Sequence, residues 1–143
     1  MGCMTALYLN ATYPDLFAAS LYVDGQWSTD ILEPLEDQTF FYFAADGDDK
    51  ASEGMANVKA MFDEDGVSYA ETTLNAKDSS DEINESIEEI ISQGYNANFI
   101  SWEEGSVLPD GANGSSMGSE HMYSFDHAYK ISSVRDWLFE QSK

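Results

Sequence analysis

Basic residues are scarce in this chain of 143 residues. Six Lys and Arg stand against 27 Asp and Glu, which gives a formal net charge of −21. Without a basic stripe to neutralise phosphates, the charge argues against a nucleic-acid ligand. It argues equally against binding to an anionic membrane surface. The acidity is typical of a strongly solvated surface, such as that of a protein from a salt-tolerant source.

Cysteine and long apolar runs are also lacking. Cys3 is the only cysteine, so no intrachain disulfide can form and nothing indicates an oxidising compartment. No run reaches the ~18 apolar residues of a membrane span, and the start lacks the basic segment of a signal peptide. These observations favour a cytoplasmic location for this chain, although a longer parent protein could be secreted.

Apolar and aromatic residues, by contrast, are plentiful. Hydrophobic residues make up 43% of the chain and aromatic residues 13%, which is typical of a globular protein with a substantial core. The length fits a single domain over residues 1–143. The sequence contains no internal repeat and no linker.

The pattern of apolar residues predicts alternating strands and helices. Strands are expected at 16–23, 38–45, 67–74 and 98–102, and helices at 1–12, 52–63, 79–93 and 133–141. The first two strand segments are nearly continuous apolar runs, as in strands buried on both faces of a parallel sheet. The sequence therefore predicts an α/β sandwich, with a mostly parallel sheet of about four strands flanked by helices.

Local signals mark some of these boundaries. Ser79 and Glu82 fit a capping box at the start of the third helix, and Gly94 ends it. Ser133 and Asp136 suggest a capping box for the last helix. Residues 103–120 are rich in Gly and Ser and predict a long loop, a kind of segment that often carries function.

Small residues occupy the start of the first helix. Gly2, Cys3 and Ala6 would let it pack closely against a strand, and Met4 and Tyr8 belong to a face that is mostly apolar. Such packing is found behind a nucleophile elbow, Gly-X-Ser-X-Gly, where a strand presents a Ser and turns into a helix. We therefore interpret the chain as the later half of a hydrolase that begins one residue after its nucleophile.

Candidate catalytic side chains lie where a strand is expected to end. Asp46, Asp48 and Asp49 follow the second strand, and His121 and His127 come later in the chain. Ligands of open α/β sheets gather at the carboxyl ends of strands. An acid followed by a His is the later part of a Ser–Asp–His triad, in which the His moves a proton and the Asp fixes its tautomer.

Plainer roles compete with catalysis for these residues. A turn Asp is usually a turn former or helix cap, and a loop His is usually structural. The acids of 46–49 also resemble the start of a calcium loop, but Gly47 lies out of register with the 12-residue calcium pattern. The sequence therefore predicts neither a metal site nor a cofactor.

Three blocks follow one another in the order of a known family. They are MGCMTALYLNATYPDLFAASLYVDGQW at 1–27, ADGDDKASEGM at 45–55 and HMYSFDHAYKISSVRDWLFEQ at 121–141. They resemble bacterial α/β-hydrolase esterases related to polyhydroxybutyrate depolymerases and feruloyl esterases, which have a prolyl-oligopeptidase-like catalytic domain. The blocks match the segment after the nucleophile, the stretch after the acid-bearing strand and the C-terminal block. The resemblance implies an α/β-hydrolase fold over nearly the whole chain.

The resemblance also implies roles for individual residues. It singles out Asp48 as the triad acid, prefers His121 to His127 as the triad base, and places the backbone N–H of Met1 in the oxyanion hole. It implies a small-molecule ester substrate for a full-length parent, hydrolysed through an acyl-enzyme intermediate.

The nucleophile is where this sequence departs from the family. No Ser precedes Met1, and Gly-X-Ser-X-Gly occurs nowhere. Ser116, with Met117 and Gly118 after it, copies Ser-Met-Gly but follows no core strand, and neither Ser115 nor Ser116 is expected to be catalytic. Cys3 is expected to pack inside the helix rather than attack a substrate. The chain by itself is therefore predicted to be inactive.

Two classes of function result. The first is the C-terminal part of a serine carboxylic-ester hydrolase, and the second is a non-catalytic, self-associating or binding module. In both cases the strand at 16–23 would lack a neighbour on one side. A bare apolar edge invites pairing with another chain, so the sequence predicts a homodimer or larger assembly.

Overall fold

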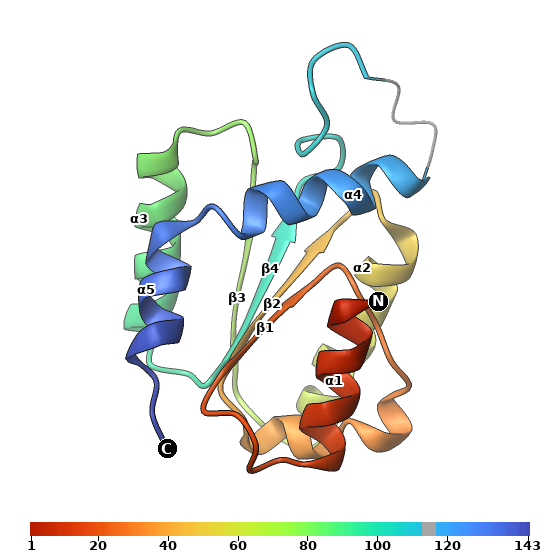
Figure 1. Cartoon of the computed structure of the whole chain (residues 1–143), viewed down its shortest axis with the longest axis vertical. Coiled ribbons are helices and arrows are strands. Elements are labelled where there is room, and N and C mark those ends of the chain that lie inside the picture. Colours follow the sequence, from red (N-terminus) through yellow and green to blue (C-terminus); the bar gives the residue numbers. More distant parts are fainter. Residues whose placement is uncertain (113–116) are drawn as a thin grey trace.

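A computed structural model describes residues 1–112 and 117–143. Within them, four strands form one sheet in the order β1-β2-β4-β3, and all neighbouring strands are parallel. The strands are β1 (Ser20–Val23), β2 (Phe40–Ala45), β3 (Ala70–Leu74) and β4 (Ala97–Trp102). Figure 1 shows helices packed around this sheet, so the predicted α/β class with a mostly parallel sheet is confirmed.

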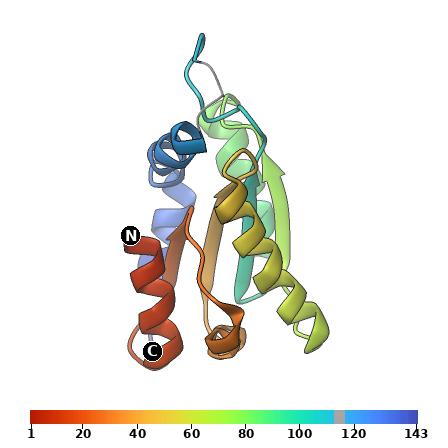
Figure 2. The ribbon, with the colours of Figure 1, turned by 90° about the vertical axis from the view of Figure 1, so that its right-hand side faces the viewer.

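Helices cover both faces of the sheet (Figures 1 and 2). They are α1 (Gly2–Thr12), α2 (Asp49–Glu64), α3 (Ser80–Ser92), α4 (Met117–Ala128) and α5 (Ser132–Glu140), with the 3-10 helices η1 (Thr29–Ile31) and η2 (Glu33–Asp37). Helices α1 and α2 pack against one face, and α3 and α5 pack against the other. Among the described residues, no helix is both long and apolar enough to cross a membrane.

Strand β2 lies in the interior of the sheet, and all six of its residues are buried. Alternate side chains point to opposite faces. Phe40 packs edge-on against Phe99 of β4, with ring centroids 5.5 Å apart, in the core under α1 and α2. Phe41 meets Trp137 of α5 at 4.7 Å on the other face. Burial on both faces explains why this segment is an almost unbroken apolar run.

The first strand is shorter than predicted. Residues 16–23 were expected to be extended and buried, yet β1 begins only at Ser20, which is paired with Phe40. Leu16 and Phe17 lie ahead of the strand with 54% and 43% of their surface exposed. The apolar run continues beyond the point where β2 can pair with it, because β2 itself starts at Phe40.

The buried face of α1 also differs from the prediction. Leu7 and Asn10 are buried, whereas Tyr8 is 46% exposed. Cys3 lies on the buried side, where a Cβ at Gly25 would come within 2.5 Å of Cys3 Cβ. The small residues thus do allow the helix to lie close to the chain that follows β1, but the apolar face through Met4 and Tyr8 is not its main contact.

Helix α4 was not predicted. Residues 103–120 were expected to form a loop with His121 at its end, but His121 lies within α4. From residue 120 onward, the buried positions of the helix are Glu120, Ser124 and Ala128, spaced four residues apart. A helix whose inward face is polar and small gives little periodic hydrophobic signal.

The predicted capping boxes had different outcomes. Ser79 caps α3 together with Glu82, as expected. The box at Ser133 and Asp136 is wrong, because α5 starts after Ile131 and has no side-chain cap of its own. Instead, Asn84 Oδ1 of α3 accepts hydrogen bonds from Ser133 N at 2.9 Å and Ser133 Oγ at 2.7 Å. A residue distant in sequence therefore accepts the hydrogen bond of a free backbone N–H at the start of α5.

Candidate functional site

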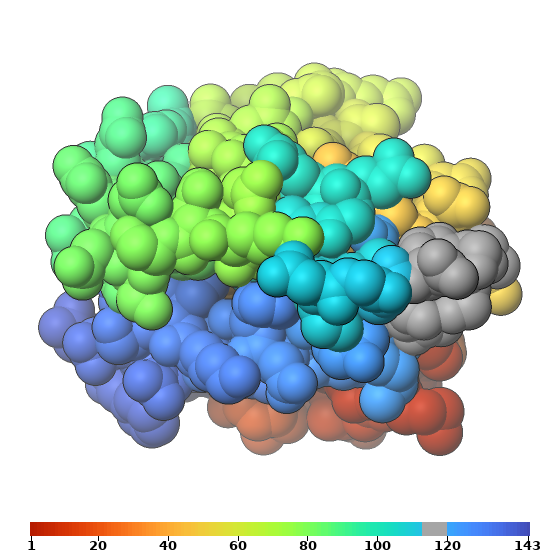
Figure 3. Space-filling model, turned by 90° about the horizontal axis from the view of Figure 1, so that it is seen from above, coloured from red at the N-terminus to blue at the C-terminus, as the bar shows by residue number. Residues whose placement is uncertain are grey.

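Helix α4 lies across the carboxyl ends of β1 and β2 (Figure 1). Seen from above, α4 runs beside the segment after β4, and the first residues of the chain emerge next to it (Figure 3). The carboxyl edge of a parallel sheet is where α/β proteins usually place their chemistry. The candidate site is built here from the ends of β1 and β2 and from α4.

Asp48 is held at the point where β2 passes into α2. Its amide donates to Ala45 O at 3.0 Å, which closes a turn directly after the strand. It is the N-cap of α2, and its Oδ1 accepts from Ala51 N at 3.4 Å. A carboxylate is favoured at this position by the unpaired N–H groups of the helix. Helix α2 thus begins three residues before the predicted start at Ser52. Asp48 therefore serves both in the turn after β2 and as the cap of α2.

His121 meets this carboxylate from α4. Its Nδ1 lies 2.6 Å from Asp48 Oδ2, although 73 residues separate the two in sequence. The imidazole is 36% exposed, whereas the Asp48 side chain is only 9% exposed. Phe125 packs edge-on against the imidazole with ring centroids 5.1 Å apart. The pair thus consists of a buried acid and a partly exposed base in a fixed orientation.

A cavity of about 260 Å³ opens onto this pair. Its lining includes Asp48, His121, Met4 of α1 and Gly25 after β1. In the described part of the chain, His121 Nε2 makes no hydrogen bond, since Nδ1 alone is paired. The start of α1 therefore faces the same space as the acid and the base, and Met1 is 91% exposed at its end.

Asp24 is a further acid of this site. It directly follows β1, has a left-handed backbone with φ of 45°, and is only 2% exposed. Its Oδ1 accepts from Ala45 N at 2.9 Å. Burial raises the pKa of the Asp24 carboxyl to about 8; the charge of Asp48 adds to the rise, while the Ser124 hydroxyl and the Ala45 amide oppose it. Asp24 thus holds its proton near neutral pH.

Gly47 and Glu120 fix the position of α4. The buried Glu120 carboxylate occupies the space that a Cβ on Gly47 would need. Its Oε1 accepts from Gly105 N in the segment after β4. Because only a glycine leaves room for this carboxylate, Gly47 lets α4 approach the turn after β2, and His121 follows Glu120 directly.

The other candidate residues have surroundings that differ from those of the pair. His127 Nε2 is 3.2 Å from Val107 O, which gives this His a structural partner. Asp49 is exposed in the first turn of α2. Burial raises the pKa of the Cys3 thiol to about 12, which disfavours the nucleophilic thiolate. Ser115 and Ser116 lie outside the described residues.

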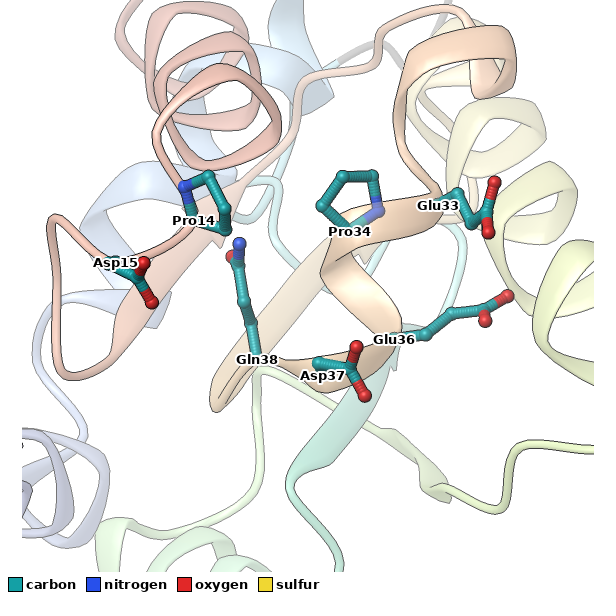
Figure 4. A pocket seen from close by; sticks show the side chains of 7 residues that line it. All are labelled: Pro14, Asp15, Glu33, Pro34, Glu36, Asp37 and Gln38. Carbon is teal, nitrogen blue, oxygen red and sulfur yellow. The ribbon is translucent and has the colours of Figure 1, made fainter.

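A second concavity, of about 530 Å³, lies near the amino end of β2 (Figure 4). Its acidic lining residues are Asp15, Glu33, Glu36 and Asp37. Burial raises the pKa of Glu36 to about 7, and the neighbouring Asp65 carboxyl adds to the rise. Its lining contains no His, Ser or Cys, and it includes neither Asp48 nor His121.

Sequence reasoning missed three polar residues of the site: Asp24, Glu120 and Ser124. The signal for Asp24 was present, because it follows an apolar run just as Asp48 follows the next one. The same rule about strand ends applies to both. Glu120 and Ser124 gave no such signal, since their burial depends on a helix that was not predicted.

Comparison with protein-family models, with curated proteins and with solved structures finds no match to this chain. The resemblance to esterases is thus untested by these comparisons, and the roles of Asp48, His121 and Met1 remain predictions. The structure shows a buried carboxylate and a partly exposed imidazole that are hydrogen bonded at the carboxyl edge of a parallel sheet.

Proposed function

We propose that this chain supplies the acid and the base of a serine carboxylic-ester hydrolase. The observation that carries the proposal is the 2.6 Å contact between His121 Nδ1 and Asp48 Oδ2. A carboxylate on Nδ1 fixes the tautomer that leaves Nε2 free to accept a proton, and it stabilises the imidazolium that then forms. Both functions, the acceptance of a proton by the base and its stabilisation by the acid, are needed when a hydroxyl attacks an ester carbonyl.

The proposed nucleophile is a serine placed directly before Met1, a position outside this sequence. Met4 lines the same cavity as Asp48 and His121, which supports a reacting group near the start of α1. In the proposed reaction the serine oxygen attacks the ester carbonyl carbon while His121 takes its proton. His121 then protonates the departing alkoxide, and water hydrolyses the acyl-enzyme by the reverse sequence. The N–H of Met1 would donate to the oxyanion.

The test uses the chain carrying an added Gly-Ala-Ser segment before Met1. We expect a fluorophosphonate probe to label the added serine and His121→Ala to slow the labelling by about 100-fold or more. Asp48→Asn should slow it as well, because the tautomer of His121 is no longer fixed. Hydrolysis of p-nitrophenyl acetate provides a second readout.

Two matched controls sharpen this experiment. Replacing the added serine by alanine should abolish labelling, and His127→Ala should leave the rate unchanged because His127 pairs with Val107 O. Labelling that is as fast in His121→Ala as in the unmodified chain would contradict the proposal.

We also propose that two copies of the chain associate through the β1 edge of the sheet. β1 pairs only with β2 in the described sheet, which leaves its other edge without a strand. Leu16 and Phe17, directly ahead of β1, are exposed by 54% and 43%. An edge strand beside exposed apolar side chains favours strand pairing between identical chains.

Sedimentation at micromolar concentration should therefore show a homodimer or a larger assembly. The net charge of −21 opposes association, so the dimer should strengthen as added salt screens this repulsion. Leu16→Glu should shift the protein to monomer, whereas Met122→Glu, at a 64% exposed position on α4, should not. A monomeric unmodified chain at high salt would refute the assembly.

A further inference from the structure

Three metal-ligating side chains converge where β1, α2 and α4 meet. Asp24 follows β1, Asp48 caps α2 and His121 lies in α4. One ligand atom from each lies within 4.8 Å of the other two. Three atoms mutually separated by this upper limit surround a point roughly 2.8 Å from each, so shifts of less than about 1 Å reach the ~2.0–2.2 Å of a zinc–ligand bond.

An unpaired buried carboxylate oxygen at the same place is a second observation. Asp24 is only 2% exposed, and its Oδ2 has no hydrogen-bond partner in the described part of the chain. Ser124 is fully buried beside this carboxyl, and its hydroxyl lowers the pKa of Asp24. Burying unpaired oxygens is unfavourable, so this arrangement has capacity for a ligand that accepts oxygen lone pairs.

We propose that Asp24, Asp48 and His121 form a binding site for a divalent transition-metal ion of the Zn²⁺ class. Two carboxylates and one imidazole suit Zn²⁺, Co²⁺ or Mn²⁺. Ca²⁺ and Mg²⁺ are poorer fits, because they prefer six or more oxygen ligands. The cavity of about 260 Å³ gives room for water at the remaining coordination position.

A metal ion and the hydrogen bond between the acid and the base cannot use the same two atoms. At 2.6 Å, His121 Nδ1 and Asp48 Oδ2 are too close to bind one ion together, because ligand atoms of a tetrahedral site lie about 3.3 Å apart. The ion therefore takes the place of the proton between them or binds through their other atoms. Either way, the site gains a use that does not depend on a serine nucleophile.

The experiment titrates Zn²⁺ into chelator-treated protein by calorimetry, with Co²⁺ absorption as a second readout. We expect one Zn²⁺ per chain with micromolar or tighter affinity, a rise in melting temperature, and a visible Co²⁺ band of the intensity typical of four-coordinate sites. Asp24→Asn and His121→Ala should each weaken Zn²⁺ binding by about 10-fold or more, because each removes one of three ligands.

Asp49→Asn and His127→Ala are the matched controls. Asp49 is exposed next to Asp48, and His127 lies on the same helix as His121 but contacts Val107 O. Both variants should bind Zn²⁺ as the unmodified chain does. Binding that survives Asp24→Asn, or that the controls weaken equally, would mean surface association and would overturn the proposal.

A third measurement is independent of variant stability. In the unmodified protein, Zn²⁺ should shift the imidazole NMR signals of His121 and leave those of His127 in place. If the His127 signals move instead, the assignment of the site is wrong. None of these readouts requires ester hydrolysis, so the metal site and the proposed hydrolase function can fail separately.

Discussion

Asp24→Asn should raise the melting temperature of this protein at pH 8. Burial raises the pKa of Asp24 from 3.8 to about 8, so ionising it costs the folded state free energy that the unfolded chain does not lose. Asn keeps an oxygen for the Ala45 N–H, which now bonds Asp24 Oδ1. It also tolerates the left-handed backbone at this position, where φ is 45°. We expect the free energy of unfolding to rise by roughly 2 kcal/mol, which corresponds to a rise in melting temperature of about 5–8 °C.

The effect should depend on pH in one direction. The pKa of Asp24 is higher in the folded state than in the unfolded chain. Its protonated form therefore contributes fully to folding stability below about pH 4, and this contribution is lost progressively as the pH rises to about 8. The advantage of Asn should therefore be small at pH 5 and largest at pH 8 and above. Thermal unfolding followed by circular dichroism across this range, in the presence of a chelator, measures it.

Asp30→Asn is the control for overall charge. Asp30 is exposed in η1, so its replacement removes one negative charge without relieving a buried carboxylate. Its effect on the free energy of unfolding should be within about 0.5 kcal/mol, as for most surface substitutions. If Asp24→Asn destabilises the protein at pH 8, or if its effect is the same at pH 5, the assigned protonation of Asp24 is wrong.

Gly25→Ala should destabilise the protein by about 1–3 kcal/mol. The added Cβ would come within 2.5 Å of Cys3 Cβ and 2.6 Å of Cys3 Sγ, closer than carbon and sulfur atoms can pack. Relief requires α1 to move away from the chain after β1. The same movement would shift Met4 in the cavity wall. Chemical denaturation gives the loss of folding free energy.

A double-mutant cycle with Cys3→Gly isolates this contact. Cys3→Gly removes both clashing atoms, so the double variant should recover at least about 1 kcal/mol relative to the sum of the single effects. Gly2→Ala is the control, since nothing lies within 4 Å of its added Cβ and alanine favours the helix. Strict additivity of Gly25→Ala and Cys3→Gly would show that α1 does not approach Gly25 in this way.

Most of the sheet was predictable from the sequence. The run at 38–45 matches β2, and the segment at 98–102 matches β4, because strands buried on both faces need continuous apolar residues. Helix α3 was equally clear, since its isoleucines recur at helical spacing and Ser79 caps it. The exposed Leu16 and Phe17 were misplaced because composition does not show how far a partner strand extends.

The candidate pair depended on more than local pattern. Strand-end position pointed to a set of three acids, and only the family resemblance chose Asp48 and His121 from among the candidates. The structure places these two side chains 2.6 Å apart. His121 was nevertheless expected on a loop, and its place on α4 could not be foreseen because that helix buries Glu120 and Ser124 instead of an apolar stripe.

The sequence by itself thus determined the α/β class, the main strands and helices, and a strongly acidic surface. These properties follow from residue type and spacing, which act over a few residues. The tertiary structure decided how closely Asp24 approaches the pair and that Asn84 caps α5. Both arise from contacts between elements far apart in the chain, whose approach depends on packing at positions such as Gly25 and Gly47.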